Sequence, residues 1–411
     1  MSLLNCWSQL FTVIKKGTIE IMSINIKPEV KAIFKNIIEW RRHIHTYPEL
    51  GMKLPKTARF VAEKLTSWGI DVETEIGISG VIGNLKGGGG PTIALRADMD
   101  ALPMQETGDV PFKSVHDGVM HACGHDGHTA MLLGAAKILS QKTEELNGSV
   151  RFIFQPGEEG YFGAKHMIND GCLSGVDEIY GIHLWNYQPY GEVGVKPGPI
   201  LAAADKFTIT IKGIGGHGAA PQGTVDAIVV GSHLVNAFQT IVSRNTNPID
   251  SAVVTVGKFQ SGNNFNIIAD TAELVGTTRA YKEEVRELVI EKMGDIILGM
   301  EKMFGAKIEM NYEKGYPPTM NAENTYEKLI SSAKKIVGEN AKEPYLSMGA
   351  EDFSYYAQEI PGCFFFVGSA PLDREPLSVP HHCSHFDIDE RALLVGSSIF
   401  VQLMEDLLEK D

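Results

Sequence analysis

The segment VMHACGHDGHTAM, residues 119–131, concentrates side chains that can bind metals or act as nucleophiles. Cys123 and His125 are two positions apart, and the apolar stretch AMLLGAAKIL that follows has the pattern of a helix. In a locally extended loop, that spacing lets both side chains point the same way. Three uses remain open from this segment alone: a metal site, a cysteine nucleophile with a histidine base, or a polar helix entrance.

Other polar groups stand where buried strands are expected to end. Taken singly, the GEEG stretch is a solvated turn, the histidine of EIYGIHL is a core residue, and HHCSH is a polar loop. Ligands bind at the carboxyl ends of strands in open α/β sheets, so we expect these groups to converge at one sheet edge. Convergence favours a metal site, because a cysteine enzyme needs neither paired glutamates nor further histidines. The groups are Asp98 and Asp100 after TIALRA, Glu158 and Glu159 after VRFIFQPG, His183 in EIYGIHL, and residues 381–385.

The donor types indicate which metals and which reaction fit. Thiolate, imidazole and carboxylate together suit Zn, Co, Ni or Mn better than Mg or Ca. Adjacent Glu158 and Glu159 point to roughly opposite sides, so one can bind a cation while the other faces a water. Metal binding lowers the pKa of a water toward about 7, and a neighbouring Glu can accept its proton. This arrangement is typical of a hydrolase.

The elements that carry these groups predict an α/β fold. Short apolar runs alternate with helical patterns up to about residue 199, which predicts a mostly parallel sheet with helices on both faces. From there, alternating strands such as KFTITIKGIG and two helical stretches predict a smaller α+β insert. We expect an N-terminal extension and a catalytic domain interrupted by a lid and dimerisation domain: residues 1–24, 25–199, 200–315 and 316–411.

Composition narrows the class of protein. The 411 residues carry a formal net charge of −14, which argues against binding nucleic acid, and no apolar run is long enough to span a membrane. Five scattered cysteines predict a reducing, cytoplasmic location. The apolar stretch near the N-terminus precedes Lys15 and Lys16, the reverse of an export signal, and a second Met at position 22 precedes the first clear helix.

Eight motifs, in order from about residue 30, together carry a family resemblance. They are RRHIHTYPELG, RADMDALPM, MHACGHDGHTAMLLGAAKIL, FQPGEEG, GIHLWN, GGHGAAPQGTVDAI, MGAEDFSYY and HHCSHFDIDERAL. The sequence resembles the aminoacylase and carboxypeptidase-like family of dinuclear metallopeptidases. Within it, the sequence is similar to the amidohydrolase branch, with hippurate hydrolases, N-acyl-amino-acid and N-acetyldiaminopimelate deacylases and auxin-conjugate hydrolases.

The resemblance implies a ligand set for two divalent metal ions per subunit, Mn, Zn, Co or Ni. Glu158 is implied as the general base. In HHCSH the family's ligand stands four residues before the Phe matched by Phe386, which selects His382 and leaves His381 and His385 as polar loop groups. The implied ligands are Cys123, His125, Glu159, His183 and His382.

Other matched positions are expected to support the ligands or the fold. Asp98 and Asp100 stand where related enzymes keep a ligand histidine and its orienting aspartate, so we expect them to support the ligands; a weak ligand role for Asp98 stays open. Structural roles are expected for the remaining residues of these motifs: His43, His45, Glu49, His121 and His128.

The insert matches the family's lid, which also forms the dimer. His217 in GGHG is implied to stabilise the oxyanion from the partner subunit, while Asn266 and Arg279 receive the substrate's carboxylate. A surface ion pair is the alternative for Arg279. Ala269 stands where the family usually has Pro, which alters a turn and not the chemistry.

These observations predict an amidohydrolase acting on N-acyl-L-amino acids, hippurate-like or N-acetylated. It is expected to be a homodimer or higher homo-oligomer that binds small molecules, N-acyl amino acids or short peptides. A dipeptidase or carboxypeptidase with the same site is the first alternative. A catalytically silent metal-binding or assembly protein is the second, and Glu158 argues against it because binding alone needs no general base.

Overall fold

The computed structural model describes residues 10–15, 18–371 and 378–410. The chain divides into two units, the first spanning Met1–Gly198, Met320–Tyr345 and Tyr355–Asp411, the second Pro199–Thr319 and Leu346–Ser354. Part of the expected extension, residues 1–24, lies outside the described residues. Its described part pairs strand β1 (Leu10–Lys15) antiparallel with β2 (Thr18–Ser23).

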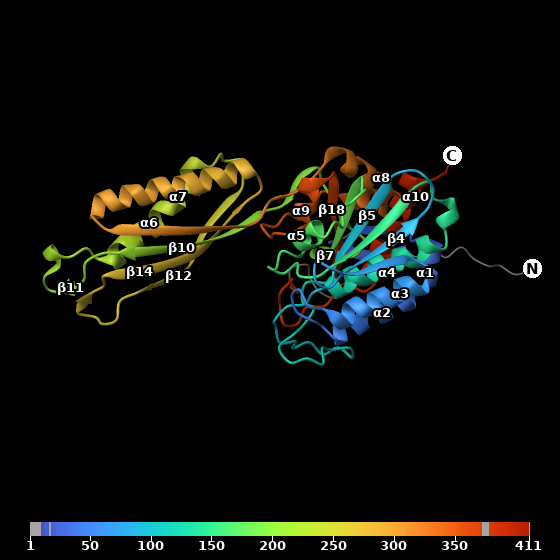
Figure 1. Cartoon of the computed structure of the whole chain (residues 1–411), viewed down its shortest axis with the longest axis horizontal. Coiled ribbons are helices and arrows are strands. Elements are labelled where there is room, and N and C mark those ends of the chain that lie inside the picture. Colours follow the sequence, from blue (N-terminus) through green and yellow to red (C-terminus); the bar gives the residue numbers. More distant parts are fainter. Residues whose placement is uncertain (1–9, 16–17, 372–377, 411) are drawn as a thin grey trace, which may run out of the picture. The chain divides into compact units, whose positions relative to one another are not determined.

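Unit 1 is built on an eight-stranded sheet in the order β17-β8-β18-β7-β5-β6-β4-β3 (Figure 1). The central strands β18, β7, β5 and β6 run parallel, whereas β8, β4 and β3 bring antiparallel pairs toward the edges. The runs TIALRA, VRFIF, EIYGIHL and CFFFVG form those central strands, so the predicted α/β class is confirmed. The strands are β3 (Asp71–Ile76), β4 (Gly80–Lys86), β5 (Thr92–Asp98), β6 (Ser149–Gln155), β7 (Glu178–Pro189), β8 (Val193–Gly194), β17 (Ala341–Lys342) and β18 (Gly362–Ala370).

Helices cover this sheet, and the most deeply buried is α4 (His125–Ser140). Nearly every residue of α4 is buried, because it packs against β5 and β7 on the sheet side and α2 and α10 on the other. This explains why its sequence is apolar all round and not amphipathic. The other helices are α1 (Pro28–Ala32), α2 (Phe34–Thr46), α3 (Pro55–Ser67), α5 (Gly163–Asn169), α8 (Glu323–Val337), α9 (Phe353–Glu359) and α10 (Ala392–Leu408).

Unit 2 is an antiparallel sheet with two helices, in the order β12-β14-β10-β15. In β10 buried residues alternate with more exposed ones, and Phe207, Ile209 and Ile211 pack under α6 and α7 in a separate core. Figure 1 shows both helices along this sheet. The elements are β10 (Ala203–Lys212), β11 (Gly216–His217), α6 (Ala227–Thr240), β12 (Ala252–Ser261), β13 (Ile267–Ile268), β14 (Thr271–Ala280), α7 (Glu283–Phe304) and β15 (Lys307–Tyr316).

Two features lie at the boundaries of the units. The chain passes between them through the short strands β9 (Gly198–Leu201) and β16 (Thr319–Asn321). The segment Leu346–Ser354 groups with unit 2, although the sequence places it in the second part of the catalytic domain. Among the described residues, no helix is long and apolar enough to cross a membrane.

Candidate metal centre

The parallel register of unit 1 brings the polar strand ends level with one another. Arg96 of β5 pairs with Gly181 of β7, so His183, two residues further on, lies level with Asp98 at the end of β5. β6 pairs with β5 up to Asp98 and Gln155, and the chain then turns into the GEEG stretch. The predicted convergence at one sheet edge therefore follows from strand pairing.

The five expected ligands lie together at this edge. Cys123 Sγ lies 3.5 Å from His183 Nε2 and 3.3 Å from His382 Nε2. Glu159 Oε1 lies 3.1 Å from His382 Nε2 and 4.0 Å from His125 Nε2. Two triads, each with donor atoms within 4.8 Å of one another, share the thiol: Cys123, His125 and His183, and Cys123, Glu159 and His382. A thiol shared between two triads is compatible with two neighbouring ions.

Unusual backbone conformations place two of these ligands. Gly124, between Cys123 and His125, has a φ of 101°, which a residue with a side chain adopts only with strain. His382 has a φ of 60°, in the left-handed region, and its amide donates to Ala122 O at 2.8 Å. Strained backbone at a non-glycine residue persists only where the surroundings hold it, and such residues cluster at functional sites.

The hydrogen bonds of the ligands fit a metal. His125 Nδ1 donates to Asp100 O at 2.8 Å and His183 Nδ1 donates to Leu184 O, so each ring turns its Nε2 toward the cluster. His125 Nε2 is buried and makes no hydrogen bond with the described residues. Buried polar atoms normally have partners, and a cation would satisfy this nitrogen.

The electrostatics favour a bound cation over a cysteine nucleophile. Burial, together with the carboxylates of Glu159 and Glu158, raises the pKa of the Cys123 thiol well above its usual value. Nucleophilic cysteines need a lowered pKa, so the cysteine-nucleophile alternative loses its support. Burial alone would lower the pKa of His125, but the carboxylates of Asp98 and Asp100 raise it to about 10. These carboxylates therefore favour a positive charge at the position of His125, and a bound cation would supply that charge.

Asp100 holds the two glutamates in place. Its Oδ1 accepts the Glu158 amide at 2.9 Å, its Oδ2 accepts the Glu159 amide at 3.1 Å, and its main-chain oxygen accepts His125 Nδ1. Glu158, with 6% of its surface exposed, has a carboxylate oxygen within 4.8 Å of ligand atoms of His125 and Glu159. One buried aspartate thus connects His125, an expected ligand, with both carboxylates.

Asp98 supports the site through His128, for which the sequence predicted only a structural role. Asp98 accepts from Arg96 Nη1 at 2.7 Å and from His128 Nδ1 at 2.6 Å. His128 Nε2 in turn accepts the amide of Leu184 at 2.8 Å, which fixes its tautomer and holds the strand next to His183. Asp98 lies 3.8 Å from His125 Nε2, so its side chain also faces the cluster. The spacing of the two histidines in HDGH, three residues apart on a helix, was the available signal.

One more histidine, His381, has a role that the sequence did not reveal. His381 Nε2 accepts the amide of Asn186 at 3.1 Å, and its Nδ1 donates to Cys123 O at 3.2 Å, so this loop residue ties the segments of two ligands together. His385 is exposed. His121 is buried, its ring nitrogens have no hydrogen-bond partner among the described residues, and burial lowers its pKa to about 3.

The RRHIHTYPELG motif acts through packing and capping. His45 Nδ1 lies 2.8 Å from Asp126 Oδ2, the carboxylate that also accepts from the fully buried Arg41 at 2.8 Å. Asp126 directly follows His125, an expected ligand, so hydrogen bonds from helix α2 hold the start of α4 in position. Glu49 accepts the amides of Lys56 and Thr57, which satisfies two free donors at the start of α3.

The three expected residues of the insert lie in unit 2. His217 is exposed on β11, pairs with Ile267 of β13, and its Nδ1 accepts the amide of Ala219. The next residue, Gly218, donates its amide to Asn266 O at 2.9 Å, so the structure brings the His217 and Asn266 segments together. Arg279 lies on β14, and it has no ion-pair partner within the part of the chain that the structure describes. Burial lowers the pKa of Arg279. No ion pair with another described residue supports the alternative of a surface ion pair, although the carboxylate of Asp205 acts on Arg279 electrostatically.

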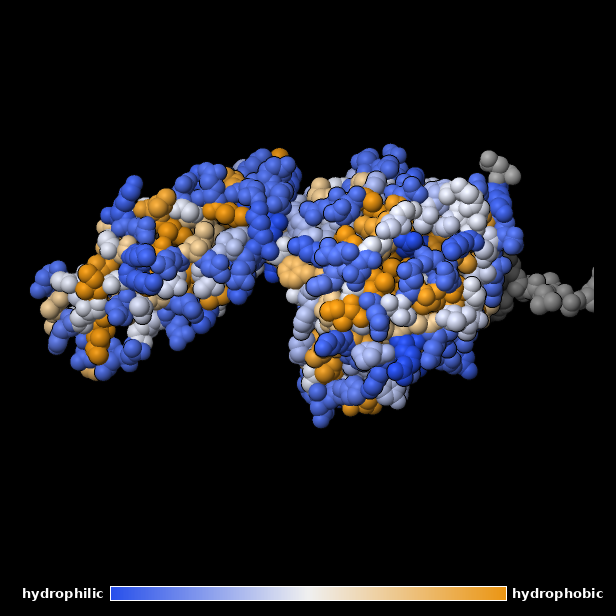
Figure 2. Space-filling model, viewed as in Figure 1, coloured by the Kyte–Doolittle hydropathy of each residue, from blue (hydrophilic) through white to orange (hydrophobic). Residues whose placement is uncertain are grey.

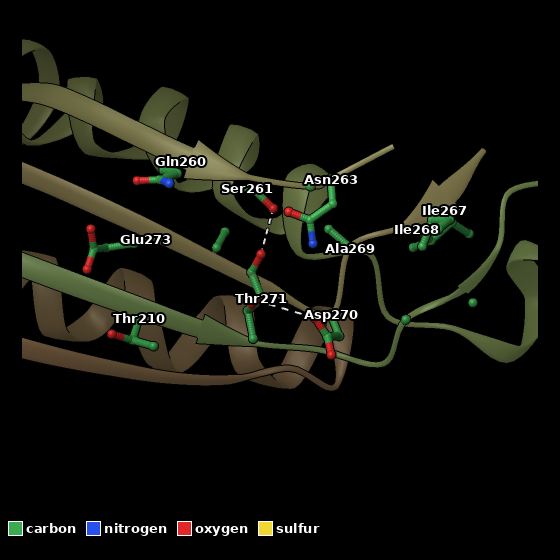
Figure 3. A pocket seen from close by; sticks show the side chains of 14 residues that line it. Thr210, Gln260, Ser261, Asn263, Ile267, Ile268, Ala269, Asp270, Thr271 and Glu273 are labelled. Atoms are coloured by element: carbon green, nitrogen blue, oxygen red, sulfur yellow. Dashed lines mark hydrogen bonds between the residues drawn. The ribbon is translucent and has the colours of Figure 1, made fainter. Parts of the chain in front are cut away.

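A cavity of about 640 Å³ in unit 2 is a separate feature (Figure 3). Ser261 donates to the main-chain oxygen of Thr271, and Asp270 and Glu273 also line the cavity. His217, Asn266 and Arg279 are not among its lining residues. Its polar, acidic lining does not suit a carboxylate substrate.

Comparisons with known proteins agree with this geometry. Thermostable carboxypeptidase 2 of Saccharolobus solfataricus is 43% identical over 380 residues, 90% of this chain and 95% of that protein. N-acetylcysteine deacetylase of Bacillus subtilis is 39% identical over 381 residues, 92% and 98% of the two chains. A solved Bacillus subtilis structure, described as a dinuclear metal binding peptidase, is 35% identical with a TM-score of 0.81 and covers 91% of this chain and 98% of that one. Residues 94–406, with all five expected ligands, match the description peptidase family M20/M25/M40, and the chain belongs to that family.

Proposed function

We propose that this protein hydrolyses the amide bond of N-acyl-L-amino acids and releases a carboxylic acid and a free amino acid. Its family and its hydrolase relatives make it a metal-dependent enzyme that acts on amides. One of the relatives reported above is named a deacetylase and the other a carboxypeptidase, and both names describe cleavage of an amide next to an amino acid. The N-acyl amino acid is the substrate class that we assign.

The proposed metal ligands are the five residues gathered at the sheet edge. Two divalent ions, Mn, Zn, Co or Ni, fit a donor set in which the Cys123 thiol belongs to both triads, and a related structure is described as dinuclear. When bound, the ions supply Lewis acidity toward a water molecule and toward the scissile carbonyl. His125 and His183 are already oriented for this by their Nδ1 hydrogen bonds.

Glu158 is the proposed general base. Its carboxylate takes a proton from the attacking water, holds it at a carboxylate oxygen, and delivers it to the amine nitrogen as the amide bond breaks. Burial of all but 6% of its surface keeps bulk water from taking that proton. Asp100 fixes its main-chain amide, so the side chain works from a stationary backbone.

The single observation that supports Glu158 as the base and Glu159 as a ligand is the different position of these two neighbouring glutamates. Glu159 Oε1 lies 3.1 Å from His382 Nε2 and forms a triad of donor atoms with Cys123 and His382, whereas Glu158 groups with His125 and Glu159 and shares no such triad with Cys123 among the described residues. We expect Glu158→Gln to keep its metal and its fold while kcat falls about 10²- to 10⁴-fold. We expect Glu159→Gln to lose metal. Metal content by mass spectrometry and kcat on an N-acyl amino acid test both; loss of metal from Glu158→Gln alone would exchange the two roles.

The insert is proposed to bind the substrate's carboxylate and to form a dimer. The half-buried guanidinium of Arg279, without an ion-pair partner in the described chain, is available for a bidentate pair with a carboxylate. Within one chain Asn266 lies near the opposite end of β14, beside His217. Unit 2 exposes Ile228, Val229 and Phe259, and hydrophobic residues reach its surface on the face drawn in Figure 2. Exposed apolar patches of this kind support an association surface. In the dimer, His217 would donate to the oxyanion of the partner's substrate.

A carboxypeptidase or dipeptidase activity is the second candidate, because the same site could cleave a peptide bond. The carboxypeptidase name of one relative favours it. Assaying N-acetyl and N-benzoyl amino acids beside dipeptides of the same amino acid separates the two activities. A higher kcat/KM on the dipeptides would replace our substrate assignment and leave the hydrolytic mechanism intact.

A further inference from the structure

Two tyrosine rings of unit 1 are stacked beside the metal centre. Tyr187, near the end of β7, and Tyr345, just after β17, have ring centroids 5.4 Å apart with an angle of 27° between the rings. Tyr187 is partly exposed and Tyr345 is 48% exposed. We call this pair the aromatic shelf. Stacked rings that stay accessible to solvent offer a flat, largely apolar surface.

The shelf begins one residue from a proposed ligand. The Tyr187 and His381 rings are 5.4 Å apart, and His381 directly precedes His382. The His381 ring is also 5.2 Å from that of His183, and its Nδ1 donates to Cys123 O. A group lying on Tyr187 is therefore adjacent to the segments that carry three of the proposed ligands.

The shelf is held in place from behind. Trp185 stacks on Phe366 at 4.2 Å, lies 4.7 Å from the Tyr187 ring, and donates its Nε1 proton to Tyr345 O at 3.0 Å. A preorganised surface loses little conformational freedom when a ligand binds to it. The two tyrosines therefore form a fixed surface.

The chemistry of the shelf selects one part of the proposed substrate. All the ring contacts of Tyr187 and Tyr345 within the described residues are with other aromatic rings. No lysine or arginine side chain among these residues contacts either ring and could pair with a carboxylate. A carboxylate placed on it would lose hydration without compensation. A flat apolar group would gain stacking and burial.

We propose that the aromatic shelf binds the acyl group of the substrate and gives the enzyme a preference for aromatic over small acyl groups. Tyr187 and Tyr345 are the residues that determine this specificity. The inference rests on the proposed hydrolysis of N-acyl amino acids and narrows it from any acyl group to planar, apolar ones.

Three substrates test the shelf: N-benzoyl-L-alanine, N-acetyl-L-alanine and N-acetyl-L-phenylalanine. The wild-type enzyme should have its highest kcat/KM on the benzoyl substrate. Tyr187→Leu and Tyr345→Leu keep an apolar side chain but remove the ring, and each should lower kcat/KM for the benzoyl substrate about 10-fold, mainly through KM. Both acetyl substrates should change less than about two-fold. Tyr326→Leu, on helix α8, is the matched control and should alter none of the three.

Each other pattern overturns the proposal in a different way. A selective loss on N-acetyl-L-phenylalanine would place the amino acid's side chain on the shelf instead. Equal losses on all three substrates would make the tyrosines supports of the ligand loops, and unchanged values would remove them from the substrate site.

Binding to metal-loaded Glu158→Gln, measured by calorimetry, is independent of turnover. There the added Tyr187→Leu change should weaken N-benzoyl-L-alanine selectively. Equal weakening of both alanine substrates, or none, would refute the shelf. If the wild type hydrolyses none of the three, the proposed function fails, and this binding comparison still decides the inference.

Discussion

Replacing Asp100 by Asn tests whether one carboxylate sets the position of Glu158, the proposed general base, and of the neighbouring Glu159. Asp100 accepts the amides of Glu158 and Glu159 at 2.9 and 3.1 Å. In Asp100→Asn one acceptor becomes an NH2 group that faces an amide proton, so one charge-assisted hydrogen bond is lost. Such a bond contributes about 1.5–3 kcal/mol. If the lost hydrogen-bond energy raises the activation free energy by the same amount, because Glu158 is no longer held in place in the transition state, kcat falls about 10- to 150-fold. Each factor of ten corresponds to about 1.4 kcal/mol.

The metal should remain in this variant. His125 donates to the main-chain oxygen of Asp100, which the substitution keeps. We therefore expect metal content near that of the wild type, with kcat reduced and KM changed little. Asp170→Asn is the matched control, because its carboxylate also accepts a backbone amide, that of Gly77 at 2.7 Å, and contacts no proposed ligand. Wild-type kcat in Asp100→Asn, or a loss of activity that follows loss of metal, would refute the positioning role.

Three further predictions concern pH, the insert and the N-terminus. The contacts of Glu390 with Arg42 and the buried Arg41 outweigh burial and lower its pKa, so its stabilisation is present above its unfolded pKa and lost as pH falls through the folded value. Glu390→Gln should therefore lower the free energy of unfolding by about 1–3 kcal/mol at pH 7, and the gap should close as the pH falls below the ordinary range of a glutamate pKa; a constant gap would contradict this. Refolding Glu158→Gln and His217→Ala together should restore about a quarter of wild-type activity if His217 acts across a dimer, and none if it acts within its own chain. A chain beginning at Met22 should keep its activity and its melting temperature within a few degrees, because Asn25 and Lys27 already bond to Ile336 and Glu405; a larger drop would show that the removed residues pack on unit 1.

The sequence was informative wherever local pattern decides structure. Apolar runs bounded by turn residues predicted the central strands, and polar residues at their ends predicted where ligand groups converge, because parallel strands share one carboxyl edge. Strand order was not predictable, since periodicity does not tell that β18 lies between β7 and β8. The support from His128 and His381 was missed for a related reason: each bonds to an amide far away in the chain, Leu184 and Asn186. The left-handed backbone of His382 has no local signal, because residues other than glycine seldom adopt it and the residue type alone does not mark where they do.

The position of β18 between β7 and β8 has a consequence for the order in which the protein can fold. β7 ends at Pro189 and β18 ends at Ala370, so about 180 residues, the insert included, are synthesised before β7 gains its second neighbour. At about 5–20 residues per second, the apolar edge of β7 stays unpaired for roughly 10 to 40 seconds, and unpaired strand edges promote aggregation. During this interval, unit 2 has its own core and an almost continuous stretch of chain, Pro199–Thr319, with which to fold. Cys123 then meets His382 across 259 residues of sequence, so the metal centre can be completed only after the last strand of the sheet is in place.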